Sequence, residues 1–307
     1  MTTSGGPDTA VRAAGRDAVV RALAEDLADG HDVTTAATIP TGLAGGAELV
    51  ARRPGVLAGL WLVGEVYAQL SDDVEVELTA QDGQRIDPGQ AAARIRGPLG
   101  VILTGERTAL NLVCHLSGIA TATRAYVEAV DGTGCVIRDT RKTVPGLRLL
   151  AKDAVRAGGG VNHRIGLWDG LLVKDNHVEV AGSVAAATRA ALDAAGELPV
   201  QVEVDTLEQL DEAITAGARD ILLDNLDVAA TAEAVARVRA LETQRGRILL
   251  ESSGAITLTD VAAYAATGVD RIAVGAITHS ARQLDLGLDV RPVGLDHTAS
   301  TDEPAER

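Results

Sequence analysis

Residues 200–225 read VQVEVDTLEQLDEAITAGARDILLDN, and this stretch decides the class of fold. It contains two short apolar runs, VQVEV at 200–204 and DILLD at 220–224, with a helical pattern of apolar residues between them. Strands that are buried on both faces read as short apolar runs, and in parallel sheets such strands alternate with helices. The stretch therefore predicts two parallel strands that are joined by a helix.

The same alternation of strand and helix continues on both sides of this stretch. The further apolar runs are CVIRD (135–139), LLVK (171–174), RILLE (247–251) and RIAVG (271–275). Polar or glycine residues follow nearly every run, and side chains that converge from many strand ends are typical of the mouth of a parallel barrel. An open sheet would instead concentrate its chemistry at one switch point. Because a regular eightfold barrel needs roughly 250 residues, residues 117–280 predict an irregular, incomplete parallel α/β barrel.

The chain before residue 117 has a different organisation. Turn signals such as QDGQ and DPGQ separate short β-like runs from helical patterns, which is typical of a small α+β layer domain. The expected helices lie at about 16–28, 60–70, 100–116 and 119–130, and the expected strands at 47–52, 74–78 and 92–95. We therefore expect an amino-terminal α+β sandwich domain over 15–116, joined by about 281–292. Residues 1–14 and 293–307 are expected to be disordered.

The composition argues against several classes of function. The formal net charge of −15 opposes binding to nucleic acid, and with no Phe and 2% aromatic residues there are few side chains on which bases could stack. The two cysteines give neither a disulfide framework nor a metal-ligand spacing. No apolar run approaches the roughly 20 residues of a membrane-spanning helix, and the first residues lack the features of a signal peptide. We therefore expect a soluble, cytoplasmic protein.

Positive charge gathers in one segment of this acidic chain. Residues 101–177 hold ten Lys or Arg against seven Asp or Glu. A local concentration of cations predicts a binding site for an anion. The chain also uses arginine as its usual cation, since it has 25 arginines and only three lysines, Lys142, Lys152 and Lys174. A lysine therefore suggests a position where a compact ammonium is needed, and Lys142 and Lys174 both lie in the motifs that follow.

Eight short motifs occur in order between residues 106 and 280. They are ERTALN (106–111), DTRKT (139–143), GGVNHR (159–164), KDNH (174–177), VEVD (202–205), LLDN (222–225), ESSG (251–254) and VGAITHS (274–280). In this order and at this spacing they resemble the quinolinate phosphoribosyltransferase family. The stretch ARRPGVLAG at 51–59 is similar to the start of that family's amino-terminal domain, so the resemblance covers nearly the whole chain.

The resemblance implies an enzyme of NAD biosynthesis, which joins quinolinate to phosphoribosyl pyrophosphate and forms nicotinate mononucleotide, pyrophosphate and carbon dioxide. Quinolinate carries two adjacent carboxylates, and forked donors together with point charges suit such a ligand. In this sequence Arg141, His163, Arg164 and Lys174 would supply them, with Arg107 as a further cation. The imidazole of His163 is thus expected to contribute to a cationic pocket.

Phosphoribosyl pyrophosphate would bring a bound Mg²⁺ as the cofactor. The carboxylate oxygens of Glu203 and Asp224 suit magnesium or ribose hydroxyls, and the resemblance implies that these two residues bind them. The glycine-rich strand ends at Ser253, Gly254 and Gly275 are the expected cradle for the 5′-phosphate. We expect Lys142 to stabilise the leaving pyrophosphate. The expected catalytic residues are then Lys142, Lys174, Glu203 and Asp224.

The resemblance also implies a homodimer or a larger oligomer, in which Arg107, and Arg52 with it, would reach the site of the neighbouring subunit. Three alternatives stay open. A barrel aldolase would use Lys174 as a Schiff-base amine. A relative of the same fold would act on a different base, and a catalytically silent protein would keep the barrel only as an anion-binding scaffold.

Overall fold

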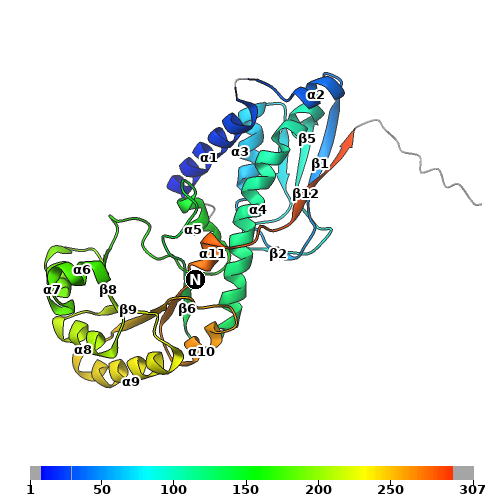
Figure 1. Ribbon diagram of the computed structural model, residues 1–307. Helices are drawn as coiled ribbons and strands as arrows, with labels where there is room; N and C mark the ends of the chain where they lie inside the picture. The colour runs from blue at the N-terminus through cyan, green and yellow to red at the C-terminus, as the bar shows by residue number, and fades with distance from the viewer. Residues whose placement is uncertain (1–7, 29, 293–307) are drawn as a thin grey trace, which may run out of the picture.

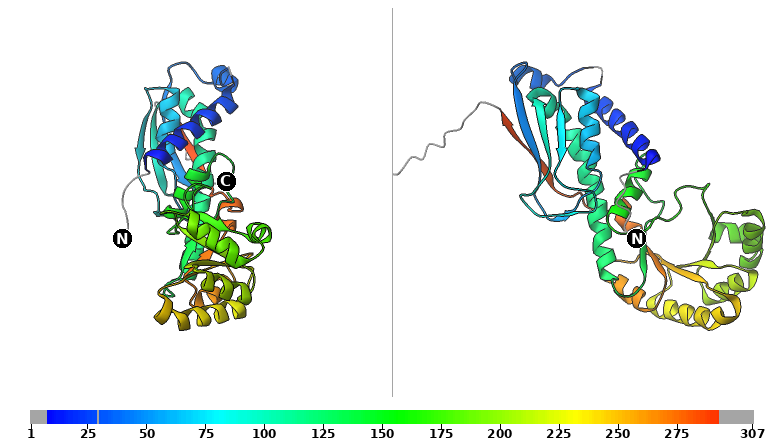
Figure 2. Two further views of the ribbon diagram at one scale, coloured as in Figure 1. Left: turned by 90° about the vertical axis from the view of Figure 1, so that its left-hand side faces the viewer. Right: turned by 180° about the vertical axis from the view of Figure 1, so that it is seen from behind.

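A long helix, α4 (Leu99–Ala129), runs through two lobes that otherwise differ in architecture (Figure 1). The computed structural model describes residues 8–28 and 30–292 of the 307-residue chain. The first lobe is built on an antiparallel sheet, and the second is a crescent of parallel strands with helices along its outer side (Figure 2). The disorder that the sequence predicts for residues 1–7 and 293–307 concerns segments outside the described residues.

The antiparallel sheet of the amino-terminal lobe has the strand order β12-β1-β5-β3. These strands are β1 (Ala44–Ala51), β3 (Glu75–Leu78), β5 (Ala91–Pro98) and β12 (Leu286–Pro292). The short strands β2 (Gly55–Val56) and β4 (Arg85–Ile86) form a separate pair. The helices of this lobe, besides α4, are α1 (Thr9–Leu27), α2 (Val33–Thr38) and α3 (Trp61–Leu70). Because β12 pairs with β1 over seven residues, the chain returns from the barrel to its first lobe.

The parallel sheet has the strand order β6-β11-β10-β9-β8-β7. These strands are β6 (Val136–Arg138), β7 (Leu171–Val173), β8 (Val200–Val204), β9 (Asp220–Asp224), β10 (Leu249–Ser253) and β11 (Arg271–Ala273). From β7 to β11, each strand lies beside the next strand in sequence, and β11 then pairs with β6. This is the cyclic order of a barrel that is opened between β6 and β7. A single parallel bridge between Arg138 and Val161 lies on the open side.

Helices follow the strands of the barrel and cover their outer side, as Figures 1 and 2 show. They are α5 (Arg148–Ala157), α6 (Asp175–Ala181), α7 (Val184–Ala194), α8 (Leu207–Ala216), α9 (Val228–Arg245), α10 (Val261–Ala266) and α11 (Ala276–His279). The helix between β8 and β9, in the stretch 200–225, shows which residues begin and end such a helix. Thr206 caps α8 by accepting the N–H of Gln209, and Gly217 ends it with a left-handed φ of 112°. The chain then turns directly into the buried strand β9.

The incomplete parallel α/β barrel beside a smaller α+β domain is confirmed, but two local predictions were wrong. The two helices expected at 100–116 and 119–130 are one helix, and Gly118 lies inside it, where it allows a close contact. A Cβ atom there would lie 2.2 Å from the carbonyl oxygen of Arg282. Residues 9–14, which were expected to be disordered, form the start of α1, and the Asp8 carboxylate caps it by accepting the N–H of Val11.

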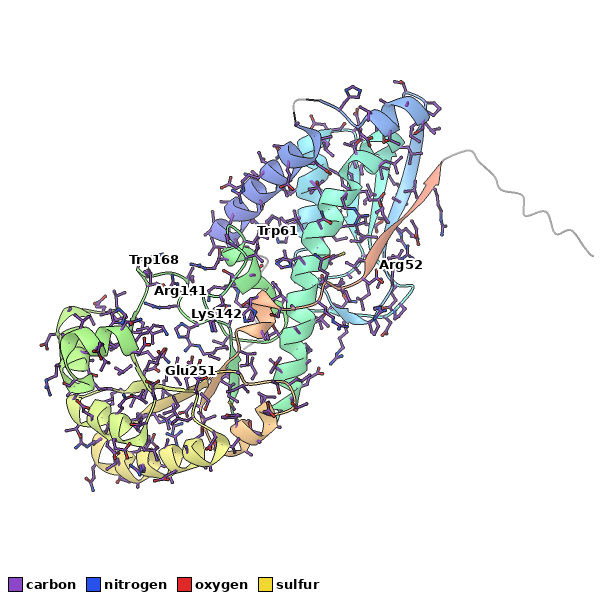
Figure 3. All side chains as sticks on the ribbon, in the orientation of Figure 1. Arg52, Trp61, Arg141, Lys142, Trp168 and Glu251 are labelled. Carbon is purple, nitrogen blue, oxygen red and sulfur yellow. The ribbon has the colours of Figure 1, made fainter. Side chains whose placement is uncertain are left out.

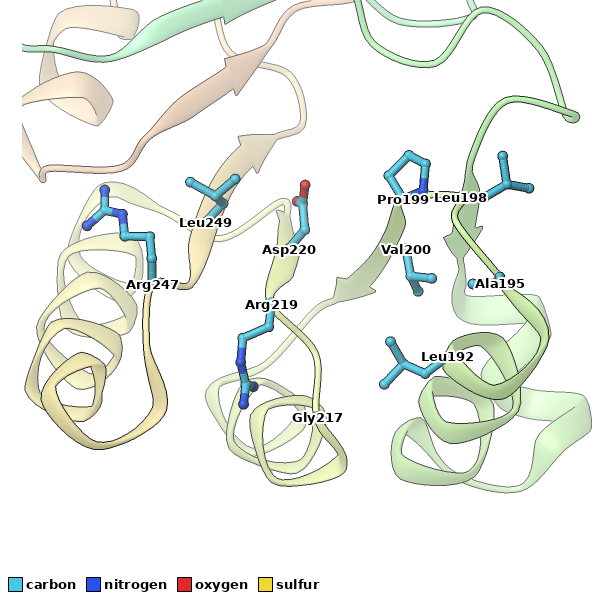
Figure 4. A pocket seen from close by; sticks show the side chains of 11 residues that line it. Leu192, Ala195, Leu198, Pro199, Val200, Gly217, Arg219, Asp220, Arg247 and Leu249 are labelled. Carbon is cyan, nitrogen blue, oxygen red and sulfur yellow. The ribbon is translucent and has the colours of Figure 1, made fainter.

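The amino-terminal ends of the barrel strands carry a hollow of about 500 Å³ on the side away from the motifs (Figure 4). It is lined by residues that precede or begin β8, β9 and β10, among them Pro199, Arg219 and Arg247. Active sites of parallel barrels form instead at the carboxyl ends of the strands, so this hollow is not the candidate site. Among the described helices, none combines the length and the apolarity that crossing a bilayer requires.

Candidate active site

The predicted site residues of the barrel lie at the carboxyl ends of its strands. Arg141 and Lys142 follow β6, Lys174 follows β7, and Glu203 is the fourth of the five residues of β8. Asp224 and Ser253, the last residues of β9 and β10, are register partners, so they lie side by side. Because all six strands are parallel, these groups share one rim of the barrel.

Lys174 and Glu203 form an ion pair at this rim. Glu203 is largely buried, and burial raises the pKa of its carboxyl group, while the hydrogen bond and charge of Lys174 act in the opposite direction. The neighbouring carboxylates of Asp224 and Asp175 raise that pKa further. The backbone N–H of Lys174 donates to Nδ1 of His177 at 2.9 Å, which fixes the start of α6. This part of the rim thus holds the cation of Lys174 among the carboxylates of Glu203, Asp224 and Asp175.

A second part of the rim is positive. Burial lowers the pKa of the Arg164 guanidinium, and the nearby charge of Arg141 lowers it further, while the charge of Asp169 opposes both. Arg164 donates to the carbonyl oxygen of Gly170 at 2.8 Å, but the Nε atoms of both arginines are buried without a hydrogen-bond partner. Within the described chain, no ion pair engages either guanidinium. Two adjacent cations with unused donors are what a binding site for an anion requires.

Lys142 lies between this positive region and the end of β11. Its backbone carbonyl accepts a hydrogen bond from the Thr278 hydroxyl at 2.8 Å, so the loop that carries it is tied to α11. A Cβ atom on Gly275 would lie 3.3 Å from Cδ of Lys142 and 3.2 Å from Nε2 of His279. Figure 3 shows Lys142 and Arg141 on the same side of the barrel, above Glu251. The side chain of Lys142 is exposed and makes no ion pair with residues 8–28 or 30–292.

The expected phosphate cradle is tightly linked to Asp224. Asn225 has a left-handed φ of 54°, donates its backbone N–H to the Ser253 carbonyl at 2.9 Å, and donates its side-chain amide to Asp224 at 2.7 Å. Gly254 has a φ of 138°, and a Cβ atom there would lie 2.7 Å from Oδ1 of Asn225. Only glycine fits this position without strain. The ends of β9 and β10 therefore form one shaped turn.

The donor set at the rim fits magnesium that is carried by a substrate rather than held by the protein alone. Glu203 and Asp224 supply hard carboxylate oxygens, but Lys174 engages the first and Asn225 the second. No cluster of three or more His, Cys, Asp or Glu side chains suited to a metal ion occurs in the part of the chain that the structure describes. Two carboxylates would leave most coordination positions to phosphate oxygens and water.

A buried ion pair that the sequence reasoning did not assign lies under the positive region. The ammonium of Lys152 donates to Asp139 at 2.7 Å and to the carbonyl oxygen of His163 at 2.9 Å. Asp139 also accepts the side-chain amide of Asn162 and the backbone N–H of His163. Burial lowers the pKa of Lys152 and raises the pKa of Asp139, and each partner's charge opposes the shift of the other. The sequence signals for this pair were the scarcity of lysine and the place of Asp139 at the start of the DTRKT motif.

The barrel interior below the rim is filled by a polar network. Glu251, which is completely buried, accepts Nη1 of Arg138 at 2.6 Å and the amide of Gln201 at 3.2 Å. Gln201 also donates to Asp220 at 2.9 Å, and Arg271 pairs with both Asp220 and Glu251. These five side chains come from five different strands, and the sequence motifs contain only Glu251, in ESSG, without giving it a role in a network. Their polar character inside apolar strands was the signal that the sequence reasoning left unused.

His163 differs from its expected role as a source of positive charge. Its Nε2 atom lies 2.8 Å from Oε1 of Gln201, and its Nδ1 atom accepts the backbone N–H of Arg164 at 2.8 Å. Burial lowers the pKa of the imidazole, although the charge of Glu251 opposes this. The expectation of a cationic imidazole is therefore corrected: both ring nitrogens are engaged within the protein, and the neutral form is favoured.

Two predicted site residues lie outside this group. Arg52 pairs with Asp289 on the antiparallel sheet of the first lobe, and Figure 3 shows it on the other side of α4 from Lys142. Arg107 is an exposed residue of α4, and no ion pair or hydrogen bond of its side chain involves residues of the described ranges. A single subunit therefore does not bring Arg52 to the cations of the barrel rim.

Comparison with known proteins gives the chain its family. The model of the quinolinate phosphoribosyl transferase N-terminal domain matches residues 32–117, and the model of the C-terminal domain matches residues 119–289. The chain is 52% identical over 281 residues to the nicotinate-nucleotide pyrophosphorylase [carboxylating] of Mycobacterium leprae, which covers 90% of this chain and 97% of that protein. It is 44% identical over 245 residues to the probable enzyme of the same name from Bacillus subtilis, which covers 80% and 83%.

A solved structure agrees with this result. The nicotinate-nucleotide pyrophosphorylase from Francisella tularensis superposes with a TM-score of 0.84 at 37% sequence identity, and the match covers 91% of this chain and 96% of that one. Both family models, the curated relatives and the solved structure cover the two lobes together. The chain is therefore a member of the quinolinate phosphoribosyltransferase family.

Proposed function

We propose that this chain transfers a phosphoribosyl group from phosphoribosyl pyrophosphate to quinolinate, and that it does so at the rim formed by Arg141, Lys142, Arg164, Lys174, Glu203 and Asp224. The observation that carries the proposal is the pair of adjacent guanidiniums, Arg141 and Arg164, which have buried donors and form no ion pair with the described residues. Quinolinate presents two neighbouring carboxylates, and two forked cations side by side match them in number and in charge.

The ribose and phosphate groups would occupy the other half of the rim. The turn at Ser253 and Gly254, together with Gly275, would offer backbone N–H groups to the 5′-phosphate, and the carboxylates of Glu203 and Asp224 would bind the ribose hydroxyls. Magnesium, when bound with the pyrophosphate, would neutralise part of its charge. Lys142 lies near Gly275, where its ammonium can stabilise the negative charge that develops as pyrophosphate leaves.

The reaction then needs positioning more than a protein nucleophile. The bond from the anomeric carbon to the pyrophosphate oxygen breaks, and that electron pair leaves with pyrophosphate. The lone pair of the quinolinate nitrogen forms the new bond to the same carbon. The bond to the adjoining carboxylate then breaks, carbon dioxide departs, and the remaining electron pair, stabilised by the cationic ring nitrogen, takes a proton from water. Arg141 and Arg164 hold the ring in line for this sequence.

Lys174 does not have the surroundings of a Schiff-base lysine. Such an amine is activated by a desolvated pocket or by a neighbouring cation. The Lys174 side chain is instead 46% exposed and paired with the carboxylate of Glu203. This arrangement favours the phosphoribosyltransferase over the aldolase alternative, and the intact set of cations gives no support to a silent scaffold.

We also propose a homodimer or higher oligomer with shared sites, in which Arg107, and Arg52 with it, completes the site of the neighbouring subunit. Two features support this arrangement. Arg107 is an exposed cation outside its own barrel rim, and Leu167 and Trp168, which closely follow Arg164, are 71% and 72% exposed. Apolar side chains this exposed beside a site are typical of a surface that a partner covers.

The experiment that tests the function is a turnover assay with quinolinate, nicotinate and nicotinamide, each with phosphoribosyl pyrophosphate and magnesium. We expect turnover with quinolinate alone, because one carboxylate or none would leave a guanidinium unpaired in the site. Release of carbon dioxide in equal amount to pyrophosphate would complete the assignment. Comparable turnover with nicotinate would show that the rim binds a different base.

A further inference from the structure

Five groups are linked by hydrogen bonds that run from the interior of the barrel to the positive region of its rim. The backbone N–H of Arg164 donates to Nδ1 of His163 at 2.8 Å, and Nε2 of His163 lies 2.8 Å from Oε1 of Gln201. The side-chain nitrogen of Gln201 then donates to Asp220 at 2.9 Å and to Glu251 at 3.2 Å. The function proposed above uses Arg164 but leaves Gln201 without a task.

The direction of every bond in this chain is determined by its two ends. The carboxylates of Asp220 and Glu251 can only accept while ionised, so the amide of Gln201 must turn its nitrogen toward them and its oxygen toward His163. The oxygen of Gln201 can only accept, so Nε2 of His163 must carry a proton. At the other end the backbone N–H of Arg164 can only donate, so Nδ1 must be unprotonated. A single neutral tautomer satisfies all of these contacts.

The charged groups around the imidazole do not favour a second proton. Burial of the ring is the largest cause that lowers the pKa of the imidazole, and Arg138, from β6, and Lys152, from α5, lower it further. Glu251, from β10, comes within 3.7 Å of Nε2 and raises this pKa, as does the hydrogen bond with Gln201. The two remaining carboxylates are already engaged: Asp139 accepts the backbone N–H of His163, and Asp220 pairs with Arg271.

We propose that Gln201 is a positioning residue, which holds His163 as the neutral imidazole protonated on Nε2 and through it fixes the backbone of Arg164. The amide joins the imidazole to two carboxylates without itself carrying charge. The positive charge of the rim then comes from arginine and lysine alone, and Arg164 keeps the orientation in which its guanidinium lies beside that of Arg141. The importance of Arg164 for quinolinate binding rests on the function proposed above, whereas the state of His163 does not.

The first arm of the test uses the unmodified protein and needs no substrate. Uniformly ¹⁵N-labelled protein is examined by long-range ¹H–¹⁵N correlation of the imidazole signals, and His163 is identified by the signals that disappear in His163→Gln. We expect one neutral tautomer with the proton on Nε2 throughout the range of about pH 6 to 8, in which an ordinary histidine would titrate. A proton on Nδ1, or an imidazolium at neutral pH, would overturn the proposal whether or not the protein uses quinolinate.

The second arm changes the amide into a carboxylate of the same shape. In Gln201→Glu the donor toward Asp220 and Glu251 is lost, and a negative charge lies against Nε2. We expect the imidazole to become doubly protonated at neutral pH, which leaves the N–H of Arg164 without its acceptor. KM for quinolinate should then rise by about tenfold, the effect of one lost hydrogen bond next to a charge, while kcat changes much less. The matched control is Gln90→Glu, because the oxygen of Gln90 accepts the N–H of Asp87 on the exposed surface of the first lobe.

The outcomes separate the two proposals. An unchanged His163 spectrum in folded Gln201→Glu would show that Gln201 does not set the imidazole. Failure of Gln201→Glu to fold would leave the first arm to decide. Absence of quinolinate turnover in the unmodified protein would sink the proposed function, while the tautomer would still decide the role of Gln201.

Discussion

The ammonium of Lys152 lies 2.7 Å from a carboxylate oxygen of Asp139, and both side chains are almost completely removed from water. The pair connects helix α5 to the segment that follows β6 and, through the backbone of His163, to the segment that carries Arg164. Stability and site geometry therefore depend on the same contact.

We predict that Lys152→Met lowers the free energy of unfolding by about 3 to 5 kcal/mol, because removal of one partner leaves a buried carboxylate unpaired. Urea unfolding followed by circular dichroism measures the change. Arg237→Met is the control, since Arg237 pairs with Glu233 and Asp211 on the exposed surface and should cost less than about 1 kcal/mol. Equal losses in the two variants would contradict a special role for the buried pair.

Two helical glycines should respond to alanine in opposite directions. A Cβ atom on Gly118 would lie 2.2 Å from the carbonyl oxygen of Arg282, whereas a Cβ atom on Gly64 would meet nothing within 4 Å. We expect Gly64→Ala to stabilise the protein by about 0.5 to 1 kcal/mol through helix propensity. Gly118→Ala should destabilise it by about 1 to 3 kcal/mol or more, because the backbone at Arg282 would have to move away from the new methyl group. Thermal unfolding of both variants gives the answer, and a neutral Gly118→Ala would mean that the contact is not close.

The sequence-based prediction and the structure agree best where burial alone determines the secondary structure. The runs at 200–204 and 220–224 became β8 and β9 with the expected bounds, because apolar residues enclosed by Pro, Gly and Thr leave few alternatives. The expectation of two separate helices at 100–116 and 119–130 was wrong, because helix α4 continues through Gly118, where the distant segment at Arg282 packs against it. That contact depends on tertiary structure, and local patterns do not contain it.

The same limit applies to the candidate site. The motifs led to Arg141, Lys174 and the two carboxylates, which lie at strand ends where chemistry is expected, and to Arg164, which lies in the segment before β7. The network under them was missed, since Gln201 and Glu251 are 50 residues apart and meet only through the register of the strands. The state of His163 followed from that network, so the sequence predicted the residue but not its charge.

Loss of a single cation at the rim should abolish function without unfolding the protein. We predict that Arg164→Ala and Lys174→Ala each lower kcat/KM by at least about 100-fold, the effect of one lost charged contact to a reacting substrate. Their melting temperatures should stay close to that of the unmodified protein. Arg189→Ala, on the exposed face of α7, serves as the control and should leave turnover unchanged. Near-normal activity of either rim variant would remove that residue from the site.

Chelation of magnesium should separate activity from stability. We expect a chelator to abolish turnover and to leave the melting temperature nearly unchanged, because the described carboxylates form no metal cluster of their own and the ion would arrive with pyrophosphate. Differential scanning calorimetry with and without chelator, on the substrate-free protein, makes the comparison. A large fall in the melting temperature would instead reveal a dedicated metal site.

Mixed dimers test whether Arg107 acts on the neighbouring subunit. Arg107→Ala and Lys174→Ala should each be nearly inactive when assembled alone. In a mixed dimer of the two variants one shared site receives both changes and the other receives neither, so random pairing should restore up to about a quarter of the original activity. Mass spectrometry of the intact dimers verifies that subunits have exchanged. If exchange occurs and activity does not return, Arg107 works within its own subunit or has no role.

Helix α4 has a consequence for how this protein can be divided. The boundary between the two family domains falls at residues 117–119, in the middle of the helix, and one apolar core contains residues of α1, α3, α4 and every strand of the barrel. A cut at that boundary would expose two half-helices and split this core. Chimeras between relatives should therefore exchange α4 as a whole, and the lobes should melt in one cooperative transition rather than in two.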